Sequence, residues 1–173
     1  MKRYLVGFLL GVLFVPLCGY LYFKWGKPPV ATGDPSLPFE KQIVSVPLHA
    51  RIDREMPATI PIAADEAANL AGASIYQTQC AACHGVPERA SPFAKAMFPR
   101  APQLFARHGE VVGVSDDAPG ESYWKVRNGI RLSGMPAYKD VLSETEMWQV
   151  TLLVAHADKL SPAVSQLLKP AGK

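Results

Sequence analysis

The chain carries two cysteines three positions apart with a histidine directly after the second, in the run Cys80-Ala81-Ala82-Cys83-His84. This spacing is typical of a site for covalent attachment of c-type haem. Each thiol can add to one vinyl group of the porphyrin to form a thioether, and the next residue then lies beneath the iron. A neutral imidazole is a common axial ligand of haem iron, so we expect His84 to bind the iron through Nε2.

Two other cysteine chemistries fit the sequence less well. A structural zinc site needs about four ligands, and the third cysteine, Cys18, lies inside an apolar run. A thioredoxin-like redox pair is expected beside a βαβ pattern, which the surrounding sequence does not show. The motif therefore predicts one covalently bound haem c as the cofactor.

A second axial ligand is predicted from Gly134-Met135-Pro136. A thioether bound to iron has to be held at a fixed depth, and a glycine before it allows a close backbone approach while a proline after it fixes φ. We expect Met135 to be this ligand, because histidine with methionine is a standard pair at haem iron. The alternatives are Met56, Met97 and, in a bis-histidine arrangement, His108.

Further residues are expected beside the cofactor. A ligating histidine needs an acceptor for its Nδ1–H, and the carbonyl of Pro102 is a candidate on a rigid stretch of backbone, although a plain turn proline fits the spacing equally well. Four side chains could pair with the haem propionates or cover the porphyrin, and each is also typical of an ordinary surface or core residue: Trp124, Arg127, Arg131 and Tyr138.

Three helices are expected to position these residues. The first runs from about Asp65 through Cys80, and it places Gly72, Tyr76 and Cys80 on one face. A short second helix covers 121–130. The last begins at Ser143, which forms a capping box with Glu146, and ends near Ala157. The segment 105–120 between the first two helices is expected to be an exposed loop.

The N-terminal segment 1–25 is expected to be a retained transmembrane anchor. Residues 4–23 form an uncharged, mostly apolar run of 20 residues, which spans about 30 Å as a helix and is long enough to cross a bilayer core. A cleaved signal peptide is an alternative, but its apolar core is usually only about 7–15 residues long. Lipidation at Cys18 is another, for which Leu17 is a poor match.

Residues 26–62 hold seven prolines and are expected to form an extended periplasmic linker, because no helix of useful length fits between the prolines. Within it, Val44, Val46, Leu48, Ala50 and Ile52 alternate with polar residues or proline. This period of two predicts a strand in 44–52, which Pro47 restricts to an edge. The strand could adhere to the chain's own domain or to a partner subunit, and plain disorder is the third option.

Length and charge restrict the classes of function. The 173 residues have room for one domain, expected over 63–160, with a tail at 161–173. The first 25 residues hold three of the 18 lysines and arginines and none of the 15 acidic residues, so the remainder is formally neutral. Nothing in this balance favours nucleic-acid binding.

Taken together, the motifs resemble the class I monohaem cytochrome c family. The resemblance covers residues 65–160 and rests on Gly72-x3-Tyr76-x3-Cys80-x2-Cys83-His84, Pro102-x-Leu104, Trp124-x2-Arg127-x-Gly129 and Gly134-Met135-Pro136, in that order. It implies an all-α fold with crossed N- and C-terminal helices and the haem in a cleft. It also implies Pro102 as the acceptor for His84, although the spacing between the two is wider than the family's.

The anchor and the linker resemble those of membrane-anchored bacterial cytochromes. Thioether attachment takes place outside the bacterial inner membrane, so we expect a single-pass protein with a cytoplasmic N-terminus and a periplasmic haem domain. The expected function is transfer of single electrons between redox protein donors and acceptors at the membrane, as a carrier rather than an enzyme. The alternatives are a fixed cytochrome c subunit of a larger respiratory oxidoreductase complex, and a haem sensor or peroxidase with a labile distal ligand.

Overall fold

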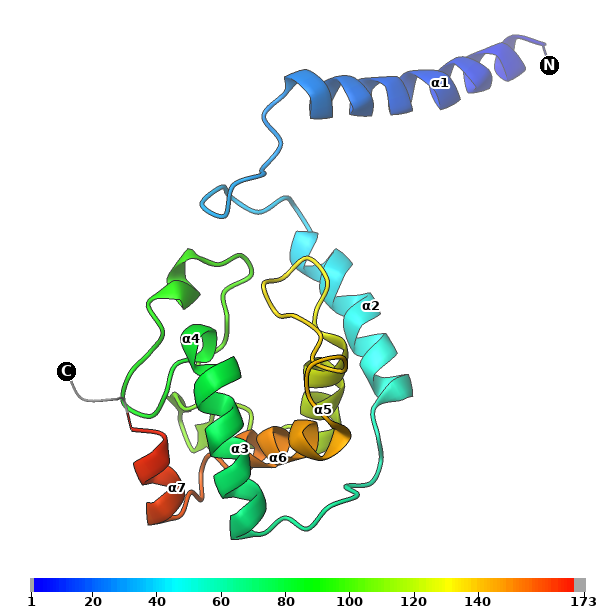
Figure 1. The fold of residues 1–173 in the computed structure, drawn as a ribbon. Helices are drawn as coiled ribbons and strands as arrows, with labels where there is room; N and C mark the ends of the chain where they lie inside the picture. Colours follow the sequence, from blue (N-terminus) through cyan, green and yellow to red (C-terminus); the bar gives the residue numbers. More distant parts are fainter. Residues whose placement is uncertain (1, 170–173) are drawn as a thin grey trace. The chain divides into compact units, whose positions relative to one another are not determined.

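The structure is a computed structural model, and it describes residues 2–169. The described chain is mostly helical, with one two-stranded hairpin, so the expected all-α fold class is confirmed. It divides into two compact units, 1–40 and 41–173. In chain order the elements are α1 (Lys2–Trp25), α2 (Glu40–Glu55), α3 (Glu66–Gln79), α4 (Ala81–His84), the 3-10 helix η1 (Phe93–Ala96), β1 (Arg107–His108), β2 (Val111–Val112), α5 (Pro119–Asn128), α6 (Glu144–Ala155) and α7 (Pro162–Leu167) (Figure 1).

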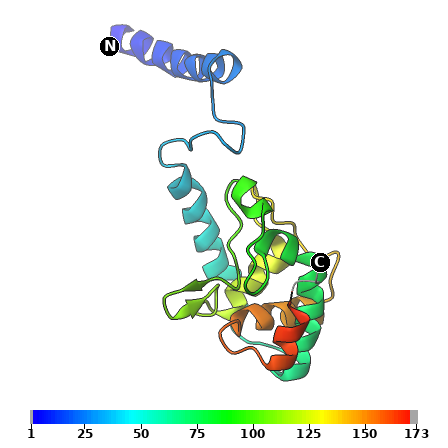
Figure 2. The same cartoon turned by 90° about the vertical axis from the view of Figure 1, so that its left-hand side faces the viewer.

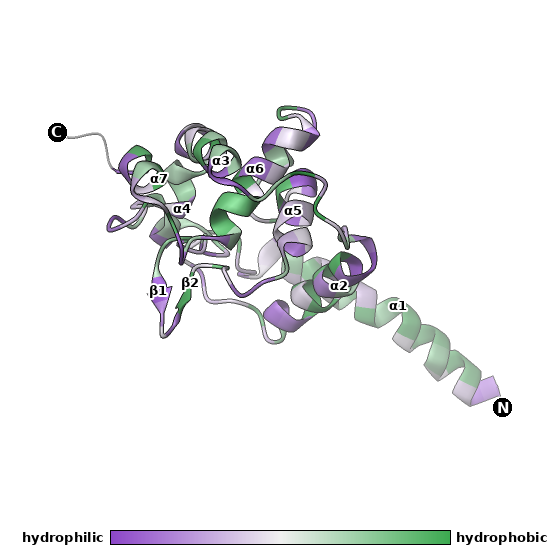
Figure 3. Ribbon diagram, turned by 90° about the horizontal axis from the view of Figure 1, so that it is seen from below, coloured by the Kyte–Doolittle hydropathy of each residue, from purple (hydrophilic) through white to green (hydrophobic). Residues whose placement is uncertain are grey.

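The first unit consists mainly of α1, a single helix of 24 residues that includes Pro16. None of its residues is buried by the rest of the chain, and Figure 3 shows it hydrophobic along nearly its whole length. Within residues 2–169 it is the one helix long and apolar enough to cross a membrane. An uncovered apolar helix of about 36 Å suits a lipid environment better than water.

The second unit is built on the crossing of α3 and α6 (Figure 1). Gly72 lies at the crossing, where a side chain would collide with the backbone carbonyl of Gln149. The helices can therefore approach closely, and they enclose a core that includes the fully buried Tyr76 and Leu153. The two helices that the sequence expects to cross are the ones that do.

Local caps close the helix ends. The capping box at the start of α6 was expected, whereas Asp65 was expected inside the first turn of α3. Asp65 is the N-cap of α3, and its carboxylate accepts from the N–H of Ala68 at 2.8 Å. Ser143 caps α6 in a complete capping box with Glu146. Gly129, with φ of +66°, ends α5, as the sequence Asn128-Gly129 suggested. These local signals need no tertiary partner, which is why they can be predicted from sequence.

The extended conformation expected for the linker is wrong over 40–55, where the structure has the helix α2. The strand expected in 44–52 is therefore absent. Every second residue of an alternating pattern also lies four positions from the next but one, which is a helical spacing. In the helix, Ser45, Leu48 and Ile52 lie on one face. Ile52 is only 1% exposed, and its burial helps to offset the roughly 3 kcal/mol that a proline such as Pro47 costs inside a helix.

The expected C-terminal tail is also partly wrong, because it contains α7. Ser161 caps this helix by accepting from the N–H of Val164 at 3.3 Å. Val164 and Leu168 are buried in the main core, and α7 lies against α3 in both views (Figures 1 and 2). Positions 170–173 of that tail, like Met1 of the anchor, lie outside the described residues.

The segment expected to be a loop, 105–120, contains the short hairpin of β1 and β2, which pair antiparallel with Arg107 opposite Val112. At the start of this segment, the ring of Phe105 packs edge-on against the ring of Tyr76, with the ring centroids 5.0 Å apart. His108 lies exposed on β1. The segment is thus fastened to the core at its start.

Candidate haem site

The junction of α3 and α4 positions the cysteine motif. Cys80 is at once the C-cap of α3 and the N-cap of α4. Its carbonyl accepts from the N–H groups of Cys83 and His84, at 3.1 and 2.9 Å. Gly85, with φ of +71°, then ends the four-residue helix. Both thiols are free, and burial, followed by the charge of Cys83, raises the pKa of Cys80 to about 12.

His84 is oriented by one short hydrogen bond. Its Nδ1 lies 2.7 Å from the carbonyl oxygen of Pro102, which is the acceptor that the sequence suggested. Nδ1 therefore carries the proton, and Nε2 keeps its lone pair for a ligand. Partial burial lowers the pKa of His84, and the bond to Pro102 opposes this shift. A neutral imidazole is the form that binds a metal.

The loop that carries Met135 is held from both sides. The N–H of Met135 donates to Oγ of Ser133 at 3.2 Å, and its carbonyl accepts from the N–H of Ile130 at 3.2 Å. The terminal methyl of Met97 packs against Gly134, where a side chain would collide with it. The methionine is thus presented on a constrained loop, and Met97, an alternative ligand in the sequence, lies against that same loop.

Tyr138 connects the methionine loop to the cysteine motif. Its hydroxyl donates to the carbonyl of Gln79 at 2.8 Å, next to Cys80, and its N–H donates to the carbonyl of Val126 at 3.1 Å. Burial raises the pKa of Tyr138, and nearby charge on Cys80 and Cys83 adds to the shift. The structure therefore brings Tyr138 to the two cysteines, and that it lies beside the cofactor stays a prediction.

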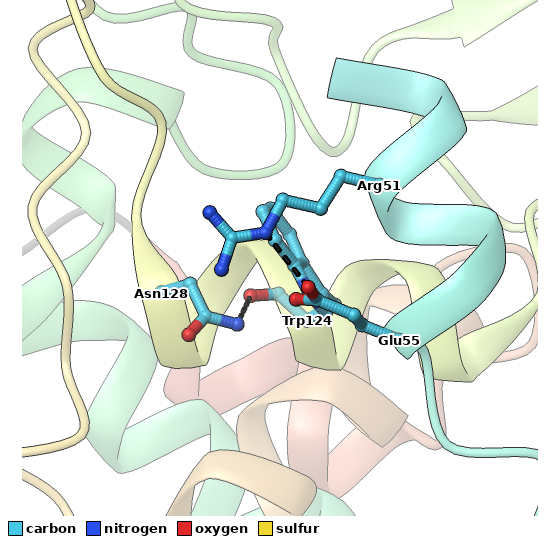
Figure 4. A network of polar contacts seen from close by, with 4 residues as sticks. All are labelled: Arg51, Glu55, Trp124 and Asn128. Carbon is cyan, nitrogen blue, oxygen red and sulfur yellow. Dashed lines mark hydrogen bonds and ion pairs between the residues drawn. The ribbon is translucent and has the colours of Figure 1, made fainter. Parts of the chain in front are cut away.

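Trp124 makes a contact that the sequence did not suggest. Its indole N–H donates to Oε2 of Glu55 at 3.0 Å, and Oε1 of that carboxylate is 2.8 Å from Nε of Arg51 (Figure 4). The Arg51 guanidinium lies 5.8 Å from the Trp124 ring centroid. Asn128 donates to the carbonyl of Trp124 at 3.0 Å. This network fastens α2 to α5.

Arg127 lines an open groove of about 490 Å³ between the segment that follows α2 and the helices α5 and α6. Pro57, Pro61 and Trp148 are among the other residues that line it. Arg131 is exposed on the loop that follows α5. That Trp124, Arg127 or Arg131 meets a haem propionate stays a prediction.

The donor set fits a covalently bound haem. The free thiol of Cys83 and the imidazole of His84 lie on α4, and the free thiol of Cys80 belongs to the residue that caps this helix. The thioether of Met135 lies on a loop that Tyr138 joins to the last residue of α3, Gln79. Within residues 2–169 there is no group of three or more histidine, cysteine or acidic side chains that could hold a bare metal ion. Glu55, Ser91 and Gln103 were not expected from the sequence, because each makes a hydrogen bond to a residue 12 or more positions away.

The chain was compared with curated proteins and with solved structures. No curated protein matches the chain. One similar solved structure is a chain of the reducing HAO-like protein complex of Kuenenia stuttgartiensis, with 21% sequence identity and a TM-score of 0.45. The match covers 79% of this chain and 54% of that one, so this chain spans about half the length of its neighbour.

A family model described as cytochrome c oxidase, cbb3-type, subunit III matches residues 66–153, just over half of the chain. The matched region begins with α3, contains the cysteine motif and the methionine loop, and ends within α6. This family implies a covalently bound haem c and a role in electron transfer. The chain belongs to this family of c-type cytochromes, as expected for a monohaem class I cytochrome c.

Proposed function

We propose that this protein is a membrane-anchored cytochrome that carries single electrons between redox protein partners at the bacterial inner membrane, through one haem c attached to Cys80 and Cys83. The observation that carries the proposal is the 2.7 Å contact of His84 Nδ1 with the Pro102 carbonyl, on the helix that bears both free thiols. It leaves Nε2 unprotonated and orients the ring, which is what an axial ligand requires.

Each side chain has a definite role in this proposal. Haem c would supply an iron that cycles between the ferrous and ferric states. The sulfurs of Cys80 and Cys83 would form the thioether links, and the imidazole of His84 and the sulfur of Met135 would hold the iron. With both axial positions filled by the protein, no substrate has access to the iron, and a thioether ligand favours the reduced form and raises the potential.

Two features support the location. The uncovered apolar helix α1 has the length of a membrane span, and thioether attachment requires the periplasmic side. We therefore propose that the N-terminus is cytoplasmic and the haem domain periplasmic. Extraction of bacterial membranes with alkaline carbonate should leave the protein in the pellet, and protease added to spheroplasts should cut the chain within 26–39 and separate the haem domain from the anchor. A protein released by carbonate, or protected in spheroplasts, would contradict this location.

The ligand assignment is tested by absorbance spectra of Met135→Ala and wild type. The wild type should show covalent haem in a pyridine haemochrome assay and the weak far-red band of sulfur bound to ferric iron. Met135→Ala should keep the haem and lose the band. The matched control is Met56→Leu, a methionine just after α2 that should leave the band intact. A band that survives Met135→Ala would exclude this residue as the ligand.

A fixed subunit of a larger oxidoreductase is the second candidate. It is favoured by the matched family, which is itself described as an oxidase subunit. Mild solubilisation followed by size-exclusion chromatography separates the two candidates. A free carrier elutes as a single small species in its detergent micelle, whereas a subunit elutes with other chains.

A haem sensor or peroxidase with a labile distal ligand is the remaining alternative. It requires that the methionine loop open readily, against the two backbone hydrogen bonds that hold Met135. Carbon monoxide added to the reduced protein distinguishes the two: a carrier should bind it slowly and incompletely. Rapid, complete binding would favour the sensor or peroxidase.

A further inference from the structure

The helix α4 is too short to bond its own last carbonyls. A helix leaves its final four C=O groups without partners inside the helix, and α4 has only four residues. Groups from outside α4 supply the partners. The carbonyl of Ala81 accepts from the N–H of the C-cap Gly85 (3.0 Å). The carbonyls of Ala82, Cys83 and His84 accept respectively from Ser91 Oγ, Gln103 Nε2 (3.2 Å) and the N–H of Leu104 (3.3 Å). The carbonyl of Gly85, just after the helix, accepts from the hydroxyl of Tyr76 (2.8 Å).

Among these partners, Gln103 makes three of the four hydrogen bonds that a primary amide can make. Its Oε1 accepts from the N–H of Ser91 at 2.6 Å, and its Nε2 donates to the carbonyls of Cys83 and Ala101, both at 3.2 Å. The amide orientation is fixed by its partners, because one is a donor and two are acceptors. Gly85 leaves room for it, since a side chain at Gly85 would collide with Oε1.

The two carbonyls that Gln103 binds immediately precede the two residues of the His84–Pro102 bond. Cys83 comes directly before His84, and Ala101 comes directly before Pro102. One primary amide therefore ties the peptide that leads into the donor histidine to the peptide that leads into the acceptor proline. Because the amide belongs to the residue after Pro102, it has little freedom to release either one alone.

We propose that Gln103 is a positioning residue that holds the His84–Pro102 hydrogen bond short and thereby sets the strength of His84 as the proximal ligand. This inference rests on the proposed ligation of haem iron by His84. A strong bond at Nδ1 makes the imidazole a better donor at Nε2, and a better donor stabilises ferric iron. Removing the hydrogen bonds of Gln103 to the carbonyls of Cys83 and Ala101 should therefore raise the reduction potential of the haem.

The test compares Gln103→Met with wild type and with the matched control Gln77→Met. Gln77 likewise donates a side-chain hydrogen bond to a backbone carbonyl, that of Leu167 at 2.9 Å, but on α7 rather than at the motif. In the reduced, haem-loaded protein, solvent exchange of the His84 Nδ1 proton is measured by NMR, and the reduction potential by redox titration. Gln103→Met should exchange at least about tenfold faster, equivalent to roughly 1.4 kcal/mol, with a higher potential, whereas Gln77→Met should change neither.

The outcomes separate this inference from the proposed function. A wild type without covalent haem in the pyridine haemochrome assay would refute the proposed function itself. A wild type with haem, beside a Gln103→Met variant of unchanged exchange and potential, would overturn only the role of Gln103. If Gln103→Met does not retain haem, Gln103→Asn decides. This shorter amide cannot reach both carbonyls, so it should shift exchange and potential in the same direction, and unchanged values would overturn the inference.

Discussion

At the level of single residues, the contact of Met97 with Gly134 joins the two sides of the candidate site. Met97 belongs to the long segment that follows His84, whereas Gly134 precedes Met135. If His84 and Met135 bind haem iron as proposed, a contact between their two segments would lie beyond the edge of the porphyrin. The wide spacing between His84 and Pro102 thus provides chain that supports the methionine loop.

We therefore predict that Met97→Ala loosens the distal ligand without removing it. Truncating this half-buried side chain should cost about 1 kcal/mol, less than the roughly 2–5 kcal/mol of a fully buried methionine. The far-red sulfur band should disappear at a lower temperature than in wild type, and carbon monoxide should bind faster. Phe93→Ala, a 62% exposed side chain on the same segment, is the control, and equal behaviour of the two variants would contradict the prediction.

At the level of elements, the crossing of α3 and α6 depends on one missing side chain. Gly72→Ala would normally stabilise a helix by about 1 kcal/mol, but here the new methyl group meets the backbone of Gln149. Backbone cannot rotate away, so we expect a net loss of roughly 1–3 kcal/mol. Urea denaturation followed by circular dichroism measures it. Ser74→Ala, on the exposed side of α3, should not be destabilised, and a stabilised Gly72→Ala would show that the helices can separate.

The attachment of α2 should depend on pH through Glu55. Its hydrogen bond with Arg51, and then that with Trp124, lowers the pKa of Glu55 below the ordinary 4.5. A carboxylate whose folded-state pKa is depressed stabilises the fold above the unfolded-state value, and this contribution is lost as the pH falls through the folded-state value. Glu55→Gln should therefore melt earlier than wild type at pH 7, with a difference that shrinks below pH 4.5.

The melting temperatures of both proteins across this pH range are the measurement. Asp53→Asn, which removes an exposed carboxylate from the same helix, controls for the loss of one negative charge. A difference between Glu55→Gln and wild type that stays constant down to pH 3 would mean that the carboxylate has no part in holding α2.

The features predicted correctly from the sequence depend on contacts between residues close together in the chain, and those missed depend on contacts between distant residues. The α6 capping box rests on residues three positions apart, and it was predicted. The conformation of 40–55 was not, because its apolar spacing suits either a strand or a helix. The choice is made by Trp124, 69 positions from Glu55. The clamp at Gln103 was missed for the same reason, since Ser91 and Cys83 are 12 and 20 positions away.

At the level of the whole molecule, α2 moves the start of the compact unit from the expected residue 63 to Lys41. The stretch between α2 and α3 is itself held down, since Gly120 at the start of α5 has no room for a side chain beside the carbonyl of Pro57. We expect limited digestion of the detergent-solubilised protein with a non-specific protease to cut first within 26–39. Mass spectrometry should find a stable fragment that retains α2, and early cuts in 57–62 would contradict this.

The helical conformation of α2 also shortens the flexible segment between α1 and the second unit. Only 14 residues, 26–39, separate α1 from α2, instead of the 37 of a fully extended linker. For a flexible chain the local concentration of one end around the other falls as about the −3/2 power of length. Shortening the segment from 37 to 14 residues therefore raises this local concentration roughly fourfold. If α1 is the proposed membrane anchor, encounters with acceptors in the same bilayer would be correspondingly more frequent, and acceptors far from the membrane would be out of reach.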